Sequence, residues 1–143
     1  MIRLSTKGRY GTRLMLDLAS HYGKGPVLLK DIAESEELSR SYLDQIVPLL
    51  KAAKLINSGR GAHGGYTLAR NPSEITLKEV IESLEGSLSP AECIDTPSVC
   101  RRNELCVTRD VWKKLGEKMS GFLETMTLKD IVNEKRIKEK RHE

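Results

Sequence analysis

The hydrophobic positions of the first 54 residues recur at the three- and four-residue spacing of amphipathic helices. The spacing predicts a helix over 5–20, a short second helix over 28–36 and a third helix over 39–54. Ser39 is a suitable N-cap for the third helix, and Pro48 should kink it because proline has no backbone N–H. The buried stripe of that helix consists of Leu43, Ile46, Val47 and Leu50.

Two apolar segments, 55–58 and 66–68, follow on either side of a loop, 59–65, that contains four glycines. They predict a β-hairpin with a flexible tip. A helix, then two short helices joined by a tight turn, then a hairpin is the order of a winged helix-turn-helix, whose second short helix enters the major groove of DNA. We therefore expect a mainly α-helical protein with a small β-hairpin wing.

A helix-start signal follows the hairpin. Thr76 and Glu79 have the spacing of a capping box, in which each side chain accepts a hydrogen bond from the other residue's backbone N–H. Ile75 and Val80 are placed to clamp across this cap as a hydrophobic staple. The pattern predicts a helix that ends near Gly86.

The rest of the chain predicts a loop over 87–105, a long helix over 107–126 and a shorter helix capped by Thr127. The long helix carries an apolar seam at three- and four-residue spacing, formed by Trp112, Leu115, Met119, Phe122 and Met126. A seam that follows a loop favours pairing with a second copy of the helix, so we expect a homodimer. Packing as core within one chain is the alternative.

These elements divide the chain into four regions. We expect a winged helix-turn-helix over 1–70, a capped helix and cysteine-containing loop over 71–106, and a dimerisation helix with a short terminal helix over 107–133. The last region, 134–143, is almost wholly charged, and we expect a frayed or disordered tail there.

The composition is that of one domain and excludes several classes of protein. The 143 residues are 38% hydrophobic and 31% charged, and no apolar run approaches the roughly 20 residues that cross a bilayer. The first residues lack the apolar core of a signal peptide, so we expect a cytoplasmic protein without a membrane partner. Aromatic residues make up only 4%, which disfavours binding of single strands by base stacking.

The positive charge is concentrated in the first half of the chain. Residues 1–70 carry 11 Lys and Arg against 6 Asp and Glu, whereas residues 71–143 carry 13 against 14. A basic half beside a balanced half suits a protein that contacts a polyanion with one end, and double-stranded DNA is the partner we expect. An unevenly charged solvated surface is the alternative.

The third predicted helix presents polar groups on the face opposite its apolar stripe, namely Ser39, Arg40, Ser41, Asp44 and Gln45. Gln45 can pair with adenine, Asp44 can accept from a cytosine amino group, and a serine at the helix N-terminus can hold a phosphate. On the predicted wing, Arg60 suits a narrow minor groove, and His63 could contact a phosphate. An ordinary solvent-exposed face is the alternative.

Cys93, Cys100 and Cys106 lie within a 14-residue window, and this clustering favours a shared ligand site over three separately buried thiols. Thiolates suit zinc or an iron–sulfur cluster, both of which usually take four protein ligands. The window contains no CxxC or CxxH pair, which weakens the zinc interpretation. The fourth ligand stays open among water, a partner chain and the nearby carboxylates of Glu92, Asp95, Glu104 and Asp110.

Three motifs resemble those of the Rrf2 family of bacterial winged-helix repressors, and of its IscR type in particular: RLSTKGRY at 3–10, LSRSYLDQI at 38–46 and RGAHGGY at 60–66. The resemblance extends over most of the chain. It implies a winged-helix homodimer that holds one 2Fe-2S cluster per subunit through the three cysteines and binds DNA according to the state of the cluster. Zinc is the less favoured occupant.

The resemblance also implies roles for single residues. It identifies Arg60 as a minor-groove arginine, Asp44 as an acidic position that helps to choose among DNA sites, and Tyr42 as part of the DNA-binding segment. The chain departs from the family at the fourth cluster ligand, because Arg109 stands where the IscR type has a histidine. Arg9 stands where nitric-oxide-sensing relatives have an aspartate, so neither known ligand transfers.

Together these features predict a repressor-type transcription regulator that binds palindromic promoter sites as a homodimer, with an affinity tuned by the cluster. Iron–sulfur assembly genes are the expected targets, and the iron–sulfur assembly machinery would supply the cluster. The alternatives are a nitric-oxide or redox sensor of the same fold and a zinc-stabilised protein-interaction module. We do not expect an enzyme, because the sequence shows no nucleophile–base pairing and no phosphate-binding loop.

Overall fold

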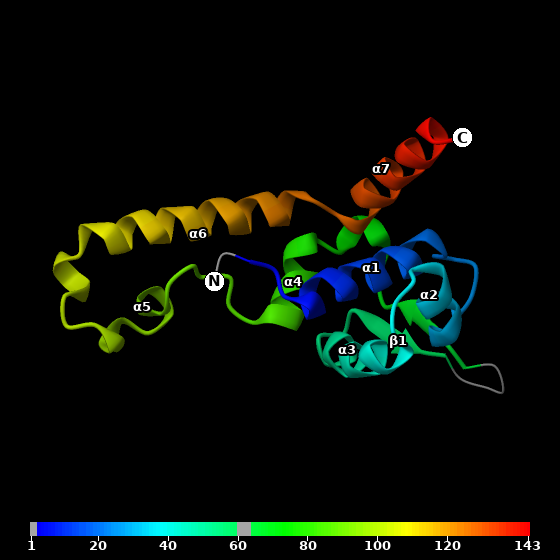
Figure 1. Cartoon of the computed structure of the whole chain (residues 1–143), viewed down its shortest axis with the longest axis horizontal. Coiled ribbons are helices and arrows are strands. Elements are labelled where there is room, and N and C mark those ends of the chain that lie inside the picture. The colour runs from blue at the N-terminus through cyan, green and yellow to red at the C-terminus, as the bar shows by residue number, and fades with distance from the viewer. Residues whose placement is uncertain (1–2, 60–63) are drawn as a thin grey trace.

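The computed structural model describes residues 3–59 and 64–143, and it has the mainly α-helical architecture with a two-stranded hairpin that the sequence predicts (Figure 1). The described elements are, in chain order, α1 (Thr6–Ser20), α2 (Leu29–Ser35), α3 (Arg40–Ala52), β1 (Ile56–Ser58), β2 (Tyr66–Leu68), the 3-10 turn η1 (Pro72–Glu74), α4 (Leu77–Glu85), α5 (Glu92–Asp95), the 3-10 turns η2 (Pro97–Val99) and η3 (Asn103–Leu105), α6 (Val107–Thr125) and α7 (Leu128–Arg141).

The helix-turn-helix consists of α2 and α3, and the hairpin follows it directly. Strands β1 and β2 pair antiparallel, with Ile56 opposite Leu68, and an isolated bridge joins Tyr66 to Val27. The helix α3 continues through Pro48, which lies on its exposed side. An exposed proline costs the helix one backbone hydrogen bond, but the apolar stripe on the other side stays buried and holds the helix together.

One cluster of buried apolar side chains is shared by α1, α2, α3, the hairpin, α4 and α7. The helix α1 packs against α3, α4 and α7, so it is the central element. Glycine permits its close approach to α4, because a Cβ on Gly11 would overlap the side chain of Leu84. The backbone N–H of Ser5, before α1, donates to Glu85 Oε1 at the end of α4 at 3.0 Å, which ties the start of α1 to α4.

The predicted capping box is confirmed. The N–H of Glu79 donates to Thr76 Oγ1 at 3.2 Å, and the N–H of Thr76 donates to Glu79 Oε2 at 3.0 Å. A second capping box of the same design begins α7, between Thr127 and Asp130. Each box satisfies backbone donors that the first turn of a helix leaves unpaired.

The expectation of a disordered tail over 134–143 is wrong, because α7 runs to Arg141. The charge run is compatible with a helix for two reasons. Glu134 precedes Lys138 by four residues, a spacing that brings the two charges together on the helix surface. Basic residues fill the last turn, where they complement the helix dipole. The segment 87–105 is likewise not a plain loop, since it contains the short turns of α5, η2 and η3.

The helix α6 extends away from the body of the molecule, and it packs mainly against α4 and α5 (Figure 1). None of its residues, all of which the structure describes, is fully buried. Of the helices in the described part of the chain, none is both long and apolar enough to cross a membrane.

Candidate nucleic-acid interface and thiol segment

The N-terminal half of α3 presents a polar face to solvent. Arg40, Ser41, Asp44 and Gln45 are all exposed there. Ser39 caps the helix: its Oγ accepts from the backbone N–H of Tyr42 at 3.4 Å and lies 2.9 Å from Ser41 Oγ. The structure thus brings the predicted DNA-contacting side chains of this helix together on one face.

Tyr42 differs from these neighbours, because it is only partly exposed and packs against the body. Its ring meets that of Tyr10 on α1 edge to face, with 5.4 Å between the centroids. The guanidinium of Arg9 lies 5.7 Å from the centre of the Tyr10 ring. Tyr42 therefore orients the start of α3, and Arg9 is an exposed cation beside Tyr10.

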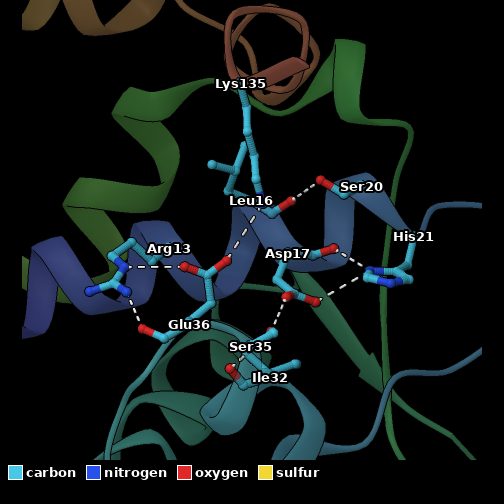
Figure 2. A network of polar contacts seen from close by, with 9 residues as sticks. All are labelled: Arg13, Leu16, Asp17, Ser20, His21, Ile32, Ser35, Glu36 and Lys135. Atoms are coloured by element: carbon cyan, nitrogen blue, oxygen red, sulfur yellow. Dashed lines mark hydrogen bonds and ion pairs between the residues drawn. The ribbon is translucent and has the colours of Figure 1, made fainter. Parts of the chain in front are cut away.

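The turn between α2 and α3 is held by a network of charges (Figure 2). The carboxylate of Glu36, whose side chain is only 14% exposed, lies 3.2 Å from Arg13 Nε on α1 and 3.7 Å from Lys135 Nζ on α7. Arg13 also donates to the backbone carbonyl of Glu36. The position of α3 thus depends on contacts with two helices distant in sequence.

A second set of contacts holds α2 itself. Asp17 on α1 is buried, and its Oδ2 accepts from Ser35 Oγ at 2.8 Å (Figure 2). His21 Nδ1 lies 2.8 Å from the Asp17 carbonyl oxygen and 3.3 Å from its Oδ1. Because Asp17 and Ser35 come from different helices, their hydrogen bond fixes α2 on α1.

The tip of the wing, with Arg60 and His63, lies outside the described residues. The base of the hairpin is described. There Gly59 N–H donates to the carbonyl of Gly65 at 2.6 Å. Gly65 has a φ of +95°, and a Cβ there would lie 2.9 Å from the carbonyl oxygen of Val27, so this position requires glycine.

The three thiols lie on the segment that leads into α6. Cys93 is part of α5 and is half-buried, Cys100 is exposed, and Cys106 is the half-buried N-cap of α6. All three are free thiols.

Cys106 is placed where a thiolate is stabilised. The hydroxyl of Thr108, 3.2 Å from the sulfur, and the backbone N–H of Arg109, 3.4 Å from it, lower the pKa of this thiol below its ordinary value, with a smaller contribution from the charge of Arg102. A thiolate is both the better nucleophile and the form that binds metal.

Arg109 also reaches back along the segment, since its Nε donates to the carbonyl oxygen of Cys93 at 3.2 Å. One residue thus contacts both Cys93 and Cys106 and keeps the first turn of α6 next to α5. The resemblance places a cluster ligand at this position in relatives, whereas here the side chain is a cation that clamps the segment.

Among the described residues, no three His, Cys, Asp or Glu side chains are grouped so as to hold a metal ion. The carboxylates considered as fourth ligands, Glu92, Asp95, Glu104 and Asp110, are all exposed. Hydrogen bonds from Ser87 and Ser89 lower the pKa of Asp95. Thiolates are suitable ligands for a 2Fe-2S cluster or for zinc. The three cysteines, however, supply one ligand fewer than the usual four, and the structure does not bring them together at one centre.

The seam predicted for α6 has two kinds of residue. Leu115, Met119 and Met126 are half-buried, and Met119 lines a cleft toward the segment before α5. Trp112 and Phe122 are exposed by 42% and 63%. Part of the seam therefore packs within the chain, and part is left as an apolar surface.

A family model described as "Rrf2: Iron-dependent Transcriptional regulator" matches residues 4–134, which is most of the chain. The chain belongs to the Rrf2 family. It is accordingly a winged-helix transcription regulator and not an enzyme.

Relatives of this Rrf2 protein carry different names. It is 38% identical to protein rrf2 of Nitratidesulfovibrio vulgaris over 93% of this chain and 89% of that protein. It is 40% identical to the regulator IscR of Serratia proteamaculans, covering 92% and 80% of the two chains. The solved structure of CymR, the global cysteine regulator of B. subtilis, is similar with a TM-score of 0.78 at 38% identity, and the match covers 93% of this chain and 98% of that chain.

Sequence patterns missed the residues that position the DNA-reading helix of this Rrf2 protein. Arg13, Glu36 and Lys135 are separated by 23 and 99 positions, so no local spacing connects them. The sequence identifies Arg9 only as a substituted ligand position, whereas the structure places it beside the ring of Tyr10, which contacts Tyr42 on α3. Only a signal that links positions far apart in the sequence, such as pairwise covariation, could predict these contacts.

Proposed function

We propose that this Rrf2 protein is a homodimeric repressor that inserts the N-terminal half of α3 into the major groove at each half of a palindromic promoter site. The observation that supports this proposal is the exposed polar face of α3. The Ser39 cap, the contact of Tyr42 with Tyr10 and the Arg13–Glu36 pair at the preceding turn keep that face toward solvent. Recognition helices of this class read bases with their first turns.

Individual contacts follow from the chemistry of the face. Gln45 can pair bidentately with adenine, and Asp44 can accept from a cytosine amino group. Arg40, with Ser39 and Ser41 at the helix start, suits phosphate. In this proposal Arg60 on the wing enters the minor groove.

Binding of a promoter fragment by single variants tests this arrangement. Gln45→Ala should weaken operator binding by about 1–3 kcal/mol and relax the base preference at the half-site position that Gln45 contacts. Arg40→Gln should weaken all sequences alike and reduce the salt slope by about 1. Lys138→Gln, the same charge change on the far end of α7, serves as control and should change neither. Unaltered binding by both α3 variants would refute the proposal.

The dimer is supported by the apolar surface of α6. Val111, Trp112 and Phe122 are exposed by 42–63% on a helix that projects from the body. Pairing with a second copy would remove this surface from water and would present two α3 helices to a palindrome. Light scattering should give a dimer mass for the native protein and a monomer mass for Phe122→Glu.

We further propose that Cys93, Cys100 and Cys106 hold one 2Fe-2S cluster per subunit and that the regulator controls iron–sulfur assembly genes. Such a cluster would supply a negative centre that links three points of the segment. The chain's own contribution is a lowered thiol pKa at Cys106 and the Arg109 clamp between α5 and α6. Ordering of this segment would bias the dimer helix and so the spacing of the two α3 helices.

A second candidate is a regulator that responds through the thiols themselves. The relatives named CymR, one described as a global cysteine regulator and one as an oxidised form, support it. So does the geometry, because Cys106 has a lowered pKa, Cys100 is exposed, and the described donors form no metal-holding group.

Protein purified without oxygen separates the two candidates. A coloured protein with iron and sulfide in equal amounts, and a loss of colour in Cys100→Ser, would support the cluster. Colourless protein with stoichiometric zinc would refute it. Metal-free protein whose operator affinity changes reversibly with oxidant and reductant would support the thiol-based regulator instead.

A further inference from the structure

A cavity of about 290 Å³ lies between the end of α1, the turn η1 and α7. Figure 1 shows α7 on the opposite side of α1 from α3. The cavity is therefore separate from the proposed DNA-reading face, and none of the three cysteines lines it.

Three cations from two separate segments line this cavity. Lys24 follows α1, whereas Lys129 and Arg136 lie two turns apart on α7. No acidic residue is among the described lining residues, and within 3–59 and 64–143 none of the three cations lies at ion-pair distance from a carboxylate. Asp130, beside Lys129 in sequence, accepts from the backbone N–H of Thr127, and the charge of Lys129 makes only a minor contribution to lowering the pKa of its carboxyl. Such a group of cations produces a positive potential that attracts an anion.

The other lining side chains suit an organic ligand. Asn71 Oδ1 accepts from Ser73 N–H at 2.9 Å, which leaves the amide N–H groups of Asn71 to donate elsewhere. The lining also includes Ala19 and Val132, which are 6% exposed, and Tyr22, which is 46% exposed. A lining that combines cationic groups with apolar side chains can bind a molecule with an anionic part and a carbon part.

We propose that this cavity is an effector site for a small organic anion. Its phosphate or carboxylate groups contact Lys24, Lys129 and Arg136, and its carbon part rests on Ala19 and Val132. A volume near 300 Å³ is at the small end of ligand pockets, so the ligand is a compact metabolite rather than a polymer.

Occupancy of the site has a route to the DNA-reading helix. The ligand would join α7 to the end of α1, and α7 carries Lys135, which pairs with Glu36 at the α2–α3 turn. An anion in the cavity would therefore favour the conformation in which α3 is anchored. This consequence for operator affinity rests on the proposed function, whereas the binding site itself does not.

Calorimetric titration of the full chain with citrate and with pyrophosphate tests the site, against chloride at matched ionic strength. Citrate has the carbon part that the proposal requires, whereas pyrophosphate has the charge alone, so we expect citrate to bind more tightly. We expect one site per chain and at least about tenfold weaker binding in Lys129→Gln and in Arg136→Gln, since each removes a charged hydrogen-bond donor. Lys138→Gln, also on α7 but not in the lining, should bind as the native chain does.

The absence of binding heat with both probes at millimolar concentration would overturn the proposal, as would equal affinity in Arg136→Gln and the native chain. Urea unfolding of each variant checks that it is folded. Operator binding measured without anion reports on the proposed function alone. If that binding fails while citrate or pyrophosphate still binds at Arg136, the effector site stands and the DNA proposal does not.

Discussion

Glu36→Gln tests whether the charge network holds the α2–α3 turn. The substitution keeps the size of the side chain and removes its negative charge. Arg13 Nε at 3.2 Å and Lys135 Nζ at 3.7 Å then lose their common partner. Because the Glu36 side chain is 14% exposed, water replaces the lost interactions only in part.

The size of the effect follows from the exposure of the three groups. Fully exposed pairs contribute about 0.2–1 kcal/mol each, and loss of one partner of a buried pair costs about 3–5 kcal/mol. The two cations here are 42% and 34% exposed, so the network lies between these limits. We expect a loss of about 1–2 kcal/mol in the free energy of unfolding, which is a fall in Tm of about 3–6 °C for a domain of this size.

Urea unfolding provides the assay, with an unchanged m-value as the sign that only stability has changed. Glu37→Gln is the matched control: Glu37 is exposed, and the structure records no ion pair for it with any residue that it describes. The effect should shrink in high salt, and Lys135→Gln should be partly non-additive with Glu36→Gln. An unchanged midpoint in Glu36→Gln, or an equal fall in Glu37→Gln, would refute the reasoning.

Three further predictions concern packing, thiol chemistry and pH. Gly11→Ala should lower the free energy of unfolding by about 1–3 kcal/mol in urea titrations, because the new methyl group overlaps Leu84. Thr108→Val should raise the pKa of the Cys106 thiol and slow its alkylation near neutral pH, since a hydroxyl hydrogen bond to sulfur is lost. Burial opposes but does not cancel the hydrogen bond from a backbone N–H and the nearby arginine charge that lower the pKa of Glu79. The Glu79 carboxylate should therefore stabilise the fold fully above its ordinary pKa of 4.5, and this stabilisation should be lost as the pH falls below that value. The difference in Tm between the native protein and Glu79→Gln, measured across this pH range, reports the loss.

Each of these predictions has a control in the same kind of element. Gly121→Ala, where no described heavy atom lies within 4 Å of the added carbon, should stabilise by about 0.5–1 kcal/mol. Thr125→Val at the far end of α6 should leave Cys106 alkylation unchanged. Glu82→Gln on the exposed side of α4 should give no Tm difference that depends on pH in this way. A destabilised Gly121→Ala or a slower reaction in Thr125→Val would contradict the respective explanation.

The local features of this protein could be predicted from its sequence. The caps at Ser39 and at Thr76 with Glu79 join residues three positions apart, and the structure contains both. The apolar stripes of the helices and the strands of the hairpin follow periodicities of two to four residues, which are visible in the sequence itself. For that reason the winged-helix architecture was predictable.

The candidate sites were predictable only in part. Sequence placed the polar face of α3 correctly, because that face is the complement of an apolar stripe. It did not show whether three neighbouring cysteines meet, since neighbours within 14 residues can still point to different places once α5 and α6 form. It also suggested one continuous seam on α6, whereas in the folded chain Leu115 is half-buried and Phe122 is exposed.

Local sequence thus determined which segments become helices and strands, because caps and periodicity act over a few residues. Tertiary structure decided what the charged C-terminal stretch does: it forms the second half of α7, and its Lys135 reaches Glu36 across 99 positions. It also gathered Lys24, Lys129 and Arg136 around one cavity. These polar contacts depend on how whole helices pack. The free energy of that packing comes from the shared apolar core, not from the polar residues that it brings together.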